Sequence, residues 1–409
     1  MFKRIIAVAV MLVLTSIFMW SAHGYISGKN SVVKSDLSDI ATNTGSEILI
    51  WYIGDEVTPY LEDVAATYRN GISIDFEQKS SLEFFENIDK LNRADEKAPD
   101  LYVIDSELLA KACYAGLAQE NPYTDIYTEE NYSKTALASS TYNEMIYGYP
   151  LYFQTAFLAY NKDYVESVPS TFEDILTYAV DTDISLYPGL ANILKWDTKN
   201  LLYNYGFLGS YINIGGVNGD DASVVEFDET GLNSSLTYYQ SLAQYFPIDI
   251  ATVNNETVVD EFVNGKTSFI ITGVDGLTLM NESGMNYGIT NFPDISEEIL
   301  TTAMSATKVV AVNPYSKKLS IAEDIAKYMS YENSESVYKT TGRIMGTRVL
   351  SEYEEKGVED IMKQYAASES LPKLIDRLDL YIHLGTTLNN IWTGTEVTAA
   401  IAALKENIY

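Results

Sequence analysis

The sequence predicts an α/β protein, because short apolar segments alternate with amphipathic segments along its first third. The first apolar run stops at Gly54-Asp55-Glu56, which is typical of a buried strand that ends in a loop. Three strand-like segments and two helix-like segments follow one another in the order 47–53, 60–68, 72–76, 82–91 and 99–105. This order predicts a parallel sheet, in which ligands lie beyond the carboxyl ends of the strands.

The net charge argues against a nucleic-acid partner. The 409 residues include 57 acidic and 27 basic side chains, for a formal charge of −30, and the basic residues form no cluster in the sequence. A phosphate backbone would be repelled by such a chain. We interpret the acidity as a general solubility feature, although it would also tolerate a cationic ligand.

Few residues are suited to nucleophilic or metal chemistry. Cys113 is the single cysteine, so a disulfide or a thiolate zinc cluster is excluded, and its small, apolar neighbours predict a packing role. The two histidines are His23 and His383, and a catalytic triad would have to use His383 alone. We therefore expect no enzyme activity, no cofactor and no metal site.

The amino terminus has the pattern of an export signal. Lys3 and Arg4 precede an apolar stretch over residues 5–20, so residues 1–24 are expected to be a signal peptide or a membrane anchor. The stretch is near the lower length limit for a spanning helix, and both alternatives stay open. Residues 25–45 are polar and predict a flexible tether. No cysteine follows the apolar stretch, so we expect a protein outside the cytoplasmic membrane, secreted or held by an uncleaved N-terminal helix, without a lipoprotein cysteine.

Four later patterns carry a resemblance to a known family. In chain order they are Ile50-Trp51-Tyr52-Ile53-Gly54-Asp55, Ala98-Pro99-Asp100-Leu101-Tyr102, Gly148-Tyr149-Pro150 with Tyr160-Asn161-Lys162-Asp163, and Phe262-Val263-Asn264-Gly265-Lys266-Thr267 with Thr272-Gly273. Together they resemble the extracellular solute-binding proteins of ABC importers, in particular the maltose-binding-protein-like, sugar-binding group.

The resemblance implies a two-lobed periplasmic-binding-protein fold of type II, with a ligand cleft between lobes joined by hinge strands. Prolines adjoin Leu151–Phe153 and Thr290–Phe292, which suits strands that bend at fixed points. The expected division is 46–151 plus 293–340 for lobe 1, and 152–292 plus 341–409 for lobe 2. The implied function is capture of a sugar or oligosaccharide and its delivery to ABC transporter permease subunits, by a protein that we expect to be a monomer.

Sugar sites combine flat rings with planar polar groups that bind hydroxyls. The candidate rings are Trp51, Tyr152, Trp196 and Tyr381. Trp51 ends a predicted strand and could equally be a core residue, and Tyr152 could only brace the hinge. Trp196 has charged neighbours and is expected to stack on the ligand, while Tyr381 aligns loosely with a stacking aromatic of the family.

The candidate polar groups are Asp55, Asp105, Gln154 and Asp275. Asp55 and Asp105 follow predicted strands at one edge of the sheet, where helix capping is an equally good reason for an aspartate. Gln154 replaces a glutamate that is common in the family, and Asp275 stands where better-known members carry an aromatic residue. These departures mean that the substrate cannot be carried over from the fold.

Three other functions were weighed. The same fold could bind a cationic ligand, such as a polyamine or basic peptide, through its aspartates and aromatic rings. A glycoside hydrolase would need a specific pair of carboxylates, and no pair stands out against so many acids. A sensor that presents its closed lobes to a membrane receptor would have the same sequence features.

Overall fold

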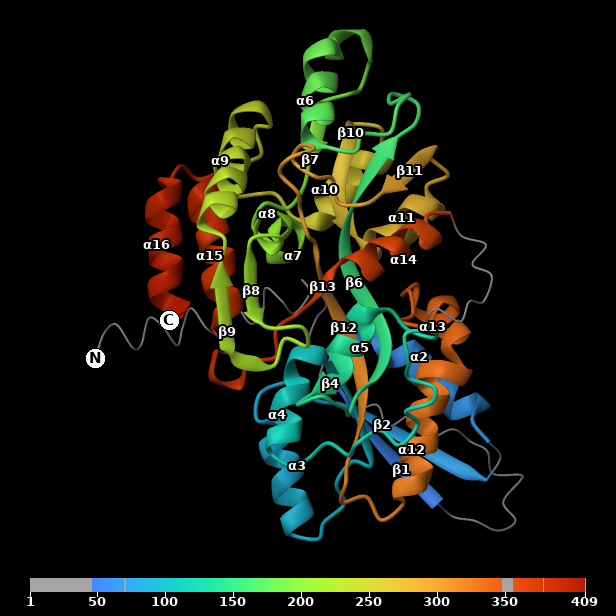
Figure 1. The fold of residues 1–409 in the computed structure, drawn as a ribbon. Helices are drawn as coiled ribbons and strands as arrows, with labels where there is room; N and C mark the ends of the chain where they lie inside the picture. Colours follow the sequence, from blue (N-terminus) through green and yellow to red (C-terminus); the bar gives the residue numbers. More distant parts are fainter. Residues whose placement is uncertain (1–45, 70, 348–355, 378, 409) are drawn as a thin grey trace.

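The computed structural model describes residues 46–69, 71–347, 356–377 and 379–408. This part of the chain forms two α/β lobes, one above the other in Figure 1, with a long central strand running from one to the other. The expected leader and tether, residues 1–24 and 25–45, lie outside the described residues.

The strands are β1 (Ser46–Tyr52), β2 (Ile72–Gln78), β3 (Leu101–Asp105), β4 (Thr141–Tyr142), β5 (Met145–Ile146), β6 (Tyr149–Asn161), β7 (Asn192–Lys195), β8 (Ile212–Gly215), β9 (Asp221–Phe227), β10 (Thr267–Gly273), β11 (Tyr287–Thr290), β12 (Met304–Val312) and β13 (Glu369–Ser370). The α-helices are α2 (Thr58–Thr67), α3 (Phe84–Arg93), α4 (Leu109–Tyr114), α5 (Lys134–Ser140), α6 (Phe172–Asp181), α7 (Leu201–Asn204), α8 (Gly206–Gly209), α9 (Glu229–Tyr245), α10 (Asn255–Val263), α11 (Leu277–Glu282), α12 (Leu319–Lys327), α13 (Ser334–Thr341), α14 (Val358–Ala367), α15 (Leu380–Trp392) and α16 (Val397–Ile408). Short 3₁₀ or π segments are η1 (Asp55–Val57), η2 (Ser106–Leu108), η3 (Ile184–Leu186), η4 (Val274–Gly276), η5 (Tyr328–Glu332) and η6 (Ile375–Arg377).

The main sheet has the strand order β2-β1-β3-β12-β6-β10-β7, with β11 beside β6 and β13 beside β12. β1 pairs in parallel with β2 and β3, as the alternation of strands and helices predicts. β12 and β6 are antiparallel to their neighbours in the middle of the sheet, and β7 is again parallel to β10. Each lobe therefore has its own group of parallel strands, and antiparallel strands join the two groups.

β6 joins the two lobes as one continuous strand. Its residues Tyr149–Thr155 pair with β12, and its residues Ala156–Asn161 pair with β10 and β11. The exchange of partners falls after Thr155, slightly beyond the expected hinge at Leu151–Phe153. A strand that changes partners within its length is a suitable place for rotation between lobes. We call residues 46–155 with 304–347 lobe 1, and residues 156–303 with 371–408 lobe 2. Two elements lie at the junction: α14, which contacts β11 and α5, and β13, which pairs with β12.

Two segments lie in the opposite lobe from the one expected. Residues 293–303 were assigned to lobe 1, but the Phe172 amide donates a hydrogen bond to the Asp294 carbonyl (2.7 Å), which ties this segment to lobe 2. The described part of 341–347, assigned to lobe 2, pairs with the first half of β6 in lobe 1. The expected boundaries were placed next to prolines, whereas long-range hydrogen bonds decide which lobe holds each of these two segments.

Three apolar clusters form the core. One packs between the sheet of lobe 1 and α3 and α4, and another between the sheet of lobe 2 and α9, α15 and α16. The third runs along the other face of the sheet through both lobes. Burial of apolar surface on both faces of a sheet covered by helices is the expected arrangement for α/β lobes, and here the sheet is mixed.

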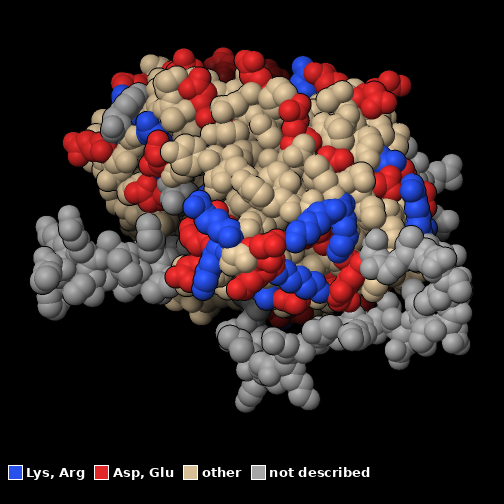
Figure 2. Space-filling view, turned by 90° about the horizontal axis from the view of Figure 1, so that it is seen from below, with Lys and Arg blue, Asp and Glu red and all other residues tan. Residues whose placement is uncertain are grey.

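The surface seen from below carries Lys and Arg side chains close to Asp and Glu side chains (Figure 2). Exposed ion pairs of lobe 1 include Arg93–Asp89 (2.8 Å), Lys97–Glu47 (2.5 Å) and Lys317–Asp95 (2.7 Å). On this face the basic residues are therefore mixed with acids rather than gathered into a patch. Among the described residues, no helix has the length and apolarity needed to cross a membrane, and no three metal-ligating side chains converge.

Candidate functional site

The same local pattern places one carboxylate in each lobe. A strand ends at or before a glycine, and an acid follows two residues later at the start of a 3₁₀ helix: Gly54 precedes Glu56 after β1, and Gly273 precedes Asp275 after β10. A Cβ at Gly54 would collide with the Glu56 carboxylate, and a Cβ at Gly273 would lie 2.8 Å from Asp275 Oδ1. Glycine thus allows each carboxylate to fold back over the end of its strand.

In lobe 1, a buried lysine contacts two acids at the ends of the strands. Lys308 Nζ lies 2.6 Å from Asp105 Oδ1 and 3.3 Å from Glu56 Oε1, and it donates a hydrogen bond to the Ile53 carbonyl (3.2 Å). Tyr152 donates its hydroxyl proton to Glu56 Oε1 at 3.0 Å. Lys308 stands beside Asp105 on one neighbouring strand and Tyr152 on the other, so sheet register brings the group together. We call Glu56, Asp105, Tyr152 and Lys308 the lobe-1 cluster.

The lobe-1 cluster is charge-compensated. Burial lowers the pKa of Lys308, but the Asp105, Tyr152 and Glu56 groups outweigh burial and hold that pKa above its ordinary value. Burial also raises the pKa of Glu56, yet the Lys308 charge and several hydrogen bonds outweigh it and leave that pKa lowered. Lys308 and Glu56 are therefore both ionised near neutral pH, and the buried lysine has a charged partner.

In lobe 2, amide and hydroxyl groups surround the carboxylate instead. Asn255 Nδ2 donates to Asp275 Oδ2 (2.8 Å), and the Tyr203 hydroxyl approaches Asp275 Oδ1 (3.5 Å). Asn255 occupies the first position of α10, where a capping box built by Asn254 fixes the start of the helix. Gln154 reaches the same place from β6, since a Cβ at Gly273 would lie 3.2 Å from Gln154 Oε1. We call Gln154, Tyr203, Asn255 and Asp275 the lobe-2 cluster.

Burial has the opposite net effect on the lobe-2 carboxyl. It is the largest influence on Asp275 and raises its pKa, although the Arg343 charge and the Asn255 hydrogen bond act against it. Arg343 also lowers the otherwise raised pKa values of Tyr152 and Tyr203, in both of which burial dominates. The Arg343 charge therefore acts on titratable groups of both clusters.

Two enclosed acceptor oxygens in this region receive no hydrogen bond from the described residues. They are Gln154 Oε1 in the lobe-2 cluster and Glu107 Oε2, which follows Asp105 by two residues. Burial, followed by the nearby Asp105 charge, raises the pKa of Glu107 to about 7. Because buried polar groups are nearly always hydrogen-bonded, these oxygens are suited to accept hydrogen bonds from a bound molecule.

The structure brings four of the eight sequence-predicted residues into these clusters: Asp105, Tyr152, Gln154 and Asp275. Asp55 is exposed, and its neighbour Glu56 takes the inward position instead. Tyr381 begins α15, donates a hydrogen bond to the Pro372 carbonyl and lies near Glu107, whose charge follows burial in raising the Tyr381 pKa.

Both candidate tryptophans belong to the core, which is the alternative left open for Trp51 and a correction for Trp196. Trp196 is 0% exposed, donates from Nε1 to Asn204 Oδ1 (2.8 Å), and meets Trp392 edge-on at 5.1 Å between ring centroids. Trp51 is 7% exposed and meets Phe84 of α3 edge-on at 5.9 Å. Their ring faces are covered by the protein itself, so neither ring is available to stack on a ligand.

Sequence reasoning missed Glu56, Glu107, Tyr203, Asn255, Lys308 and Arg343. Two of them had a readable signal. Lys308 is a lone charge in an otherwise apolar strand, and lysine is almost never buried without a partner. Glu56 follows the strand-glycine-x-acid pattern, which repeats at Asp275. Nothing local distinguishes Tyr203 among 32 tyrosines.

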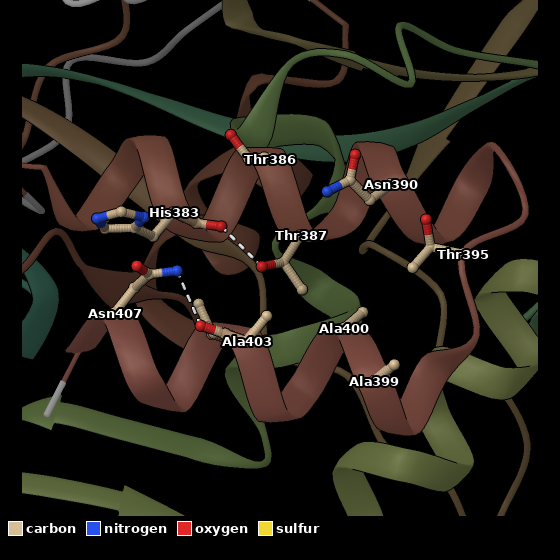
Figure 3. Close-up of a pocket in the computed structure, with 10 residues that line it drawn as sticks. His383, Thr386, Thr387, Asn390, Thr395, Ala399, Ala400, Ala403 and Asn407 are labelled. Carbon is tan, nitrogen blue, oxygen red and sulfur yellow. Dashed lines mark hydrogen bonds between the residues drawn. The ribbon is translucent and has the colours of Figure 1, made fainter. Parts of the chain in front are cut away.

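A pocket of about 140 Å³ lies elsewhere, between α15 and α16 (Figure 3). Thr386, Thr387 and Asn390 reach it from α15, and Ala399 and Ala403 face it from α16. It contains none of the residues of the two clusters.

The fold and the polar groups between its lobes are those of a binding protein, and comparison with known proteins gives its class. Residues 62–361 match the model of the bacterial extracellular solute-binding proteins, so the chain belongs to that family. This is a family of transport proteins that bind solutes, not of enzymes, as the sequence predicted.

Particular relatives share about a fifth of their residues with the chain. A maltooligosaccharide ABC transporter solute-binding lipoprotein of Streptococcus pneumoniae is 22% identical over 348 residues, covering 82% of each chain. The maltodextrin-binding protein MdxE of Bacillus subtilis is 21% identical and covers 90% of this chain and 92% of its own. A galactooligosaccharide-binding protein of Bacillus subtilis is 22% identical, with 93% and 92% covered.

Solved structures share the fold. A cyclo/maltodextrin-binding protein complexed with maltotetraose superposes with a TM-score of 0.74 at 18% identity, covering 90% of this chain and 98% of its own. The extracellular solute-binding protein of Staphylococcus aureus in complex with maltose gives a TM-score of 0.75 at 20% identity, with the same coverage. The predicted two-lobed fold of type II is confirmed.

The relatives correct the predicted localisation. We expected a secreted or helix-anchored protein and excluded lipid attachment, but two Streptococcus pneumoniae relatives are named solute-binding lipoproteins. The exclusion of lipid attachment was therefore wrong for this class of protein. It relied on cysteine position, and the single cysteine, Cys113, lies in α4.

Proposed function

We propose that this protein captures an oligosaccharide between its two lobes outside the cytoplasmic membrane and delivers it to the permease of an ABC transporter. The observation that carries the proposal is the pair of enclosed acceptors, Gln154 Oε1 and Glu107 Oε2, beside the carboxyl groups at the strand ends. Sugar hydroxyls are good donors to such oxygens, and a site built for them discriminates strongly in favour of hydroxylated ligands.

The relatives support the same class of ligand. They are named for maltooligosaccharides, maltodextrin and galactooligosaccharides, and the similar solved structures hold maltose, maltotetraose or maltopentaose. The hydroxyl groups of Tyr152 and Tyr203 lie within the two clusters, beside the carboxyl groups of Glu56 and Asp275.

A cationic ligand finds no support in the relatives. The lobe-1 acids Glu56 and Asp105 already share the ammonium of Lys308 as an ion-pair partner, and the Arg343 charge acts on both clusters. A polyamine would have to approach these two fixed positive charges in a place of low dielectric constant.

Calorimetric titration of the purified protein with maltotetraose, a galactooligosaccharide and spermidine tests the proposal. We expect one of the oligosaccharides to bind and spermidine not to bind. Asp275→Asn should weaken the binding of that oligosaccharide by roughly tenfold, because it removes a charged acceptor.

Asp260→Asn is the matched control, since this aspartate lies on the exposed side of α10 and bonds Asn264 within the same helix turn. Binding of spermidine without either oligosaccharide would refute the proposed ligand class. An Asp275→Asn variant that binds like Asp260→Asn would remove Asp275 from the site.

A further inference from the structure

A hairpin of lobe 2 reaches lobe 1 away from the two clusters. β8 and β9 form a two-stranded sheet of their own, separate from the main sheet. Their connecting loop is tight, because Gly215, Gly216 and Gly219 all have positive φ and a Cβ at Gly215 would lie 2.7 Å from the Gly219 backbone. The loop ends at Asp220.

Asp220 makes a hydrogen bond across the lobe boundary. The backbone amide of Asn143 in lobe 1 donates a hydrogen bond to Asp220 Oδ2 at 2.6 Å. Asn143 and Glu144 form the two-residue turn between β4 and β5, and both have positive φ, as such hairpin turns require. Two tight hairpins, one from each lobe, therefore meet through a single charged hydrogen bond.

Lys373 makes a second connection beside the first. Its backbone amide donates to the Gly219 carbonyl, which fixes Lys373 to lobe 2. Its Nζ donates to the Ala138 carbonyl of lobe 1 (2.7 Å) and to the Asn218 carbonyl of the loop. Ala138 lies in the last turn of α5, where the helix dipole favours a cation. The side chain is 1% exposed.

These bonds must break if the lobes separate. Burial lowers the pKa of Lys373 to about 8, and the Asp220 charge acts against burial. The lysine is therefore held in an unfavourable environment by its interlobe partners, and it has no role in either cluster. A contact present in one conformation and absent in another shifts the equilibrium between them.

We propose that Asp220 and Lys373 form an interlobe clasp, which stabilises the closed arrangement of the lobes without contacting the ligand. The consequence for affinity rests on the proposed function, because only a ligand held between the lobes benefits from closure. The clasp itself requires no ligand, so it is tested on the ligand-free protein.

Cys113 provides the probe, since it is the single cysteine of the chain and lies in α4, which contacts β4 next to the Asn143–Glu144 turn. Burial raises the pKa of the Cys113 thiol to about 12; Lys373 acts to lower that pKa and Asp220 to raise it. Maleimide reacts with the exposed thiolate, so opening of the lobes should speed labelling.

The two variants Asp220→Ala and Lys373→Met separate opening from electrostatics. Through charge alone, loss of Asp220 should speed labelling and loss of Lys373 should slow it. If the clasp holds the lobes together, both variants should label faster than the parent, by roughly tenfold for loss of a charged hydrogen bond. Asp221→Ala is the matched control, because the exposed side chain of the neighbouring Asp221 accepts hydrogen bonds from Ser223 of its own strand.

Faster labelling of Asp220→Ala together with slower labelling of Lys373→Met would overturn the clasp, as would unchanged labelling of both. If Lys373→Met lacks a cooperative thermal melt, X-ray scattering of Asp220→Ala decides. A radius of gyration larger than that of Asp221→Ala is then expected, and an equal radius would refute the proposal.

Discussion

Glu56 and Asp275 have the same local surroundings and opposite electrostatic outcomes. Each follows a strand and a glycine, and each is the second residue of a 3₁₀ helix at the carboxyl edge of its sheet. The Lys308 ammonium lies 3.3 Å from Glu56, whereas Asp275 receives the Asn255 amide at 2.8 Å. The pKa of Glu56 is lowered and that of Asp275 is raised, although burial acts upwards on both.

The difference shows that local sequence places a carboxyl group but a distant partner decides its charge state. In lobe 1 the protein itself supplies a cation, Lys308, to the two acids, so this half of the site is organised in advance. In lobe 2 the carboxyl group has neutral hydrogen-bonding neighbours and keeps acceptor capacity, which Gln154 Oε1 adds to. Preorganised groups reduce the cost of binding, and unsatisfied acceptors supply the attraction.

The largest effect is expected from Trp196→Ala, which tests whether the lobe-2 half of the site is held in place by the core of that lobe. Trp196 and Tyr239 both donate to Asn204 Oδ1, and Asn204 belongs to α7, the helix that carries Tyr203. Removing a fully buried tryptophan should lower the free energy of unfolding by about 3–5 kcal/mol. Urea denaturation measures this loss of stability. The control is Tyr245→Ala, because Tyr245 is a large aromatic residue with an exposed side chain. A loss no larger than that of the control would contradict the core assignment.

Lys308→Met should destabilise the protein by about 3 kcal/mol, because it leaves Asp105 and Glu56 without their cation. The value is at the low end for buried pairs, since the Asp105 side chain is 37% exposed. The exposed Lys339→Met is the control. A second change, Asp105→Asn, should recover part of the loss, and a double variant less stable than Lys308→Met would argue against charge compensation.

The smallest effect is a difference in pH dependence. The lowered pKa of Glu56 gives stability that is present above its ordinary value of 4.5 and is lost as pH falls. The raised pKa of Asp275 gives the opposite sign, with stability present below its ordinary value of 3.8 and lost as pH rises through the folded-state pKa. Relative to Glu56→Gln, the parent should therefore lose stability as pH falls below about 4.5, and relative to Asp275→Asn it should lose stability as pH rises above about 3.8. The free energies of unfolding are measured by urea denaturation at several pH values. If the stability difference from the parent changed with pH in the same direction for both variants, the contrast between the lobes would be contradicted.

Much of the architecture could be predicted because it depends on short segments. Strand and helix periodicity in residues 47–105 indicated the parallel α/β arrangement, and the carboxyl ends of those strands indicated where Asp105 would lie. Gln154 and Asp275 were also named from the sequence, and the structure brings them to one place. Position at a strand end is local information, so a single sequence contains it.

What the sequence alone determined is thus the family, the α/β order of the elements and the residues that end the strands. The tertiary structure alone decided which of these residues have partners from elsewhere in the chain. Trp196 has charged neighbours in sequence, yet Trp392 and Asn204 enclose it, and Glu56 rather than Asp55 meets Lys308, 252 positions away. Burial and charge state depend on the sum of such long-range contacts, which no local pattern contains.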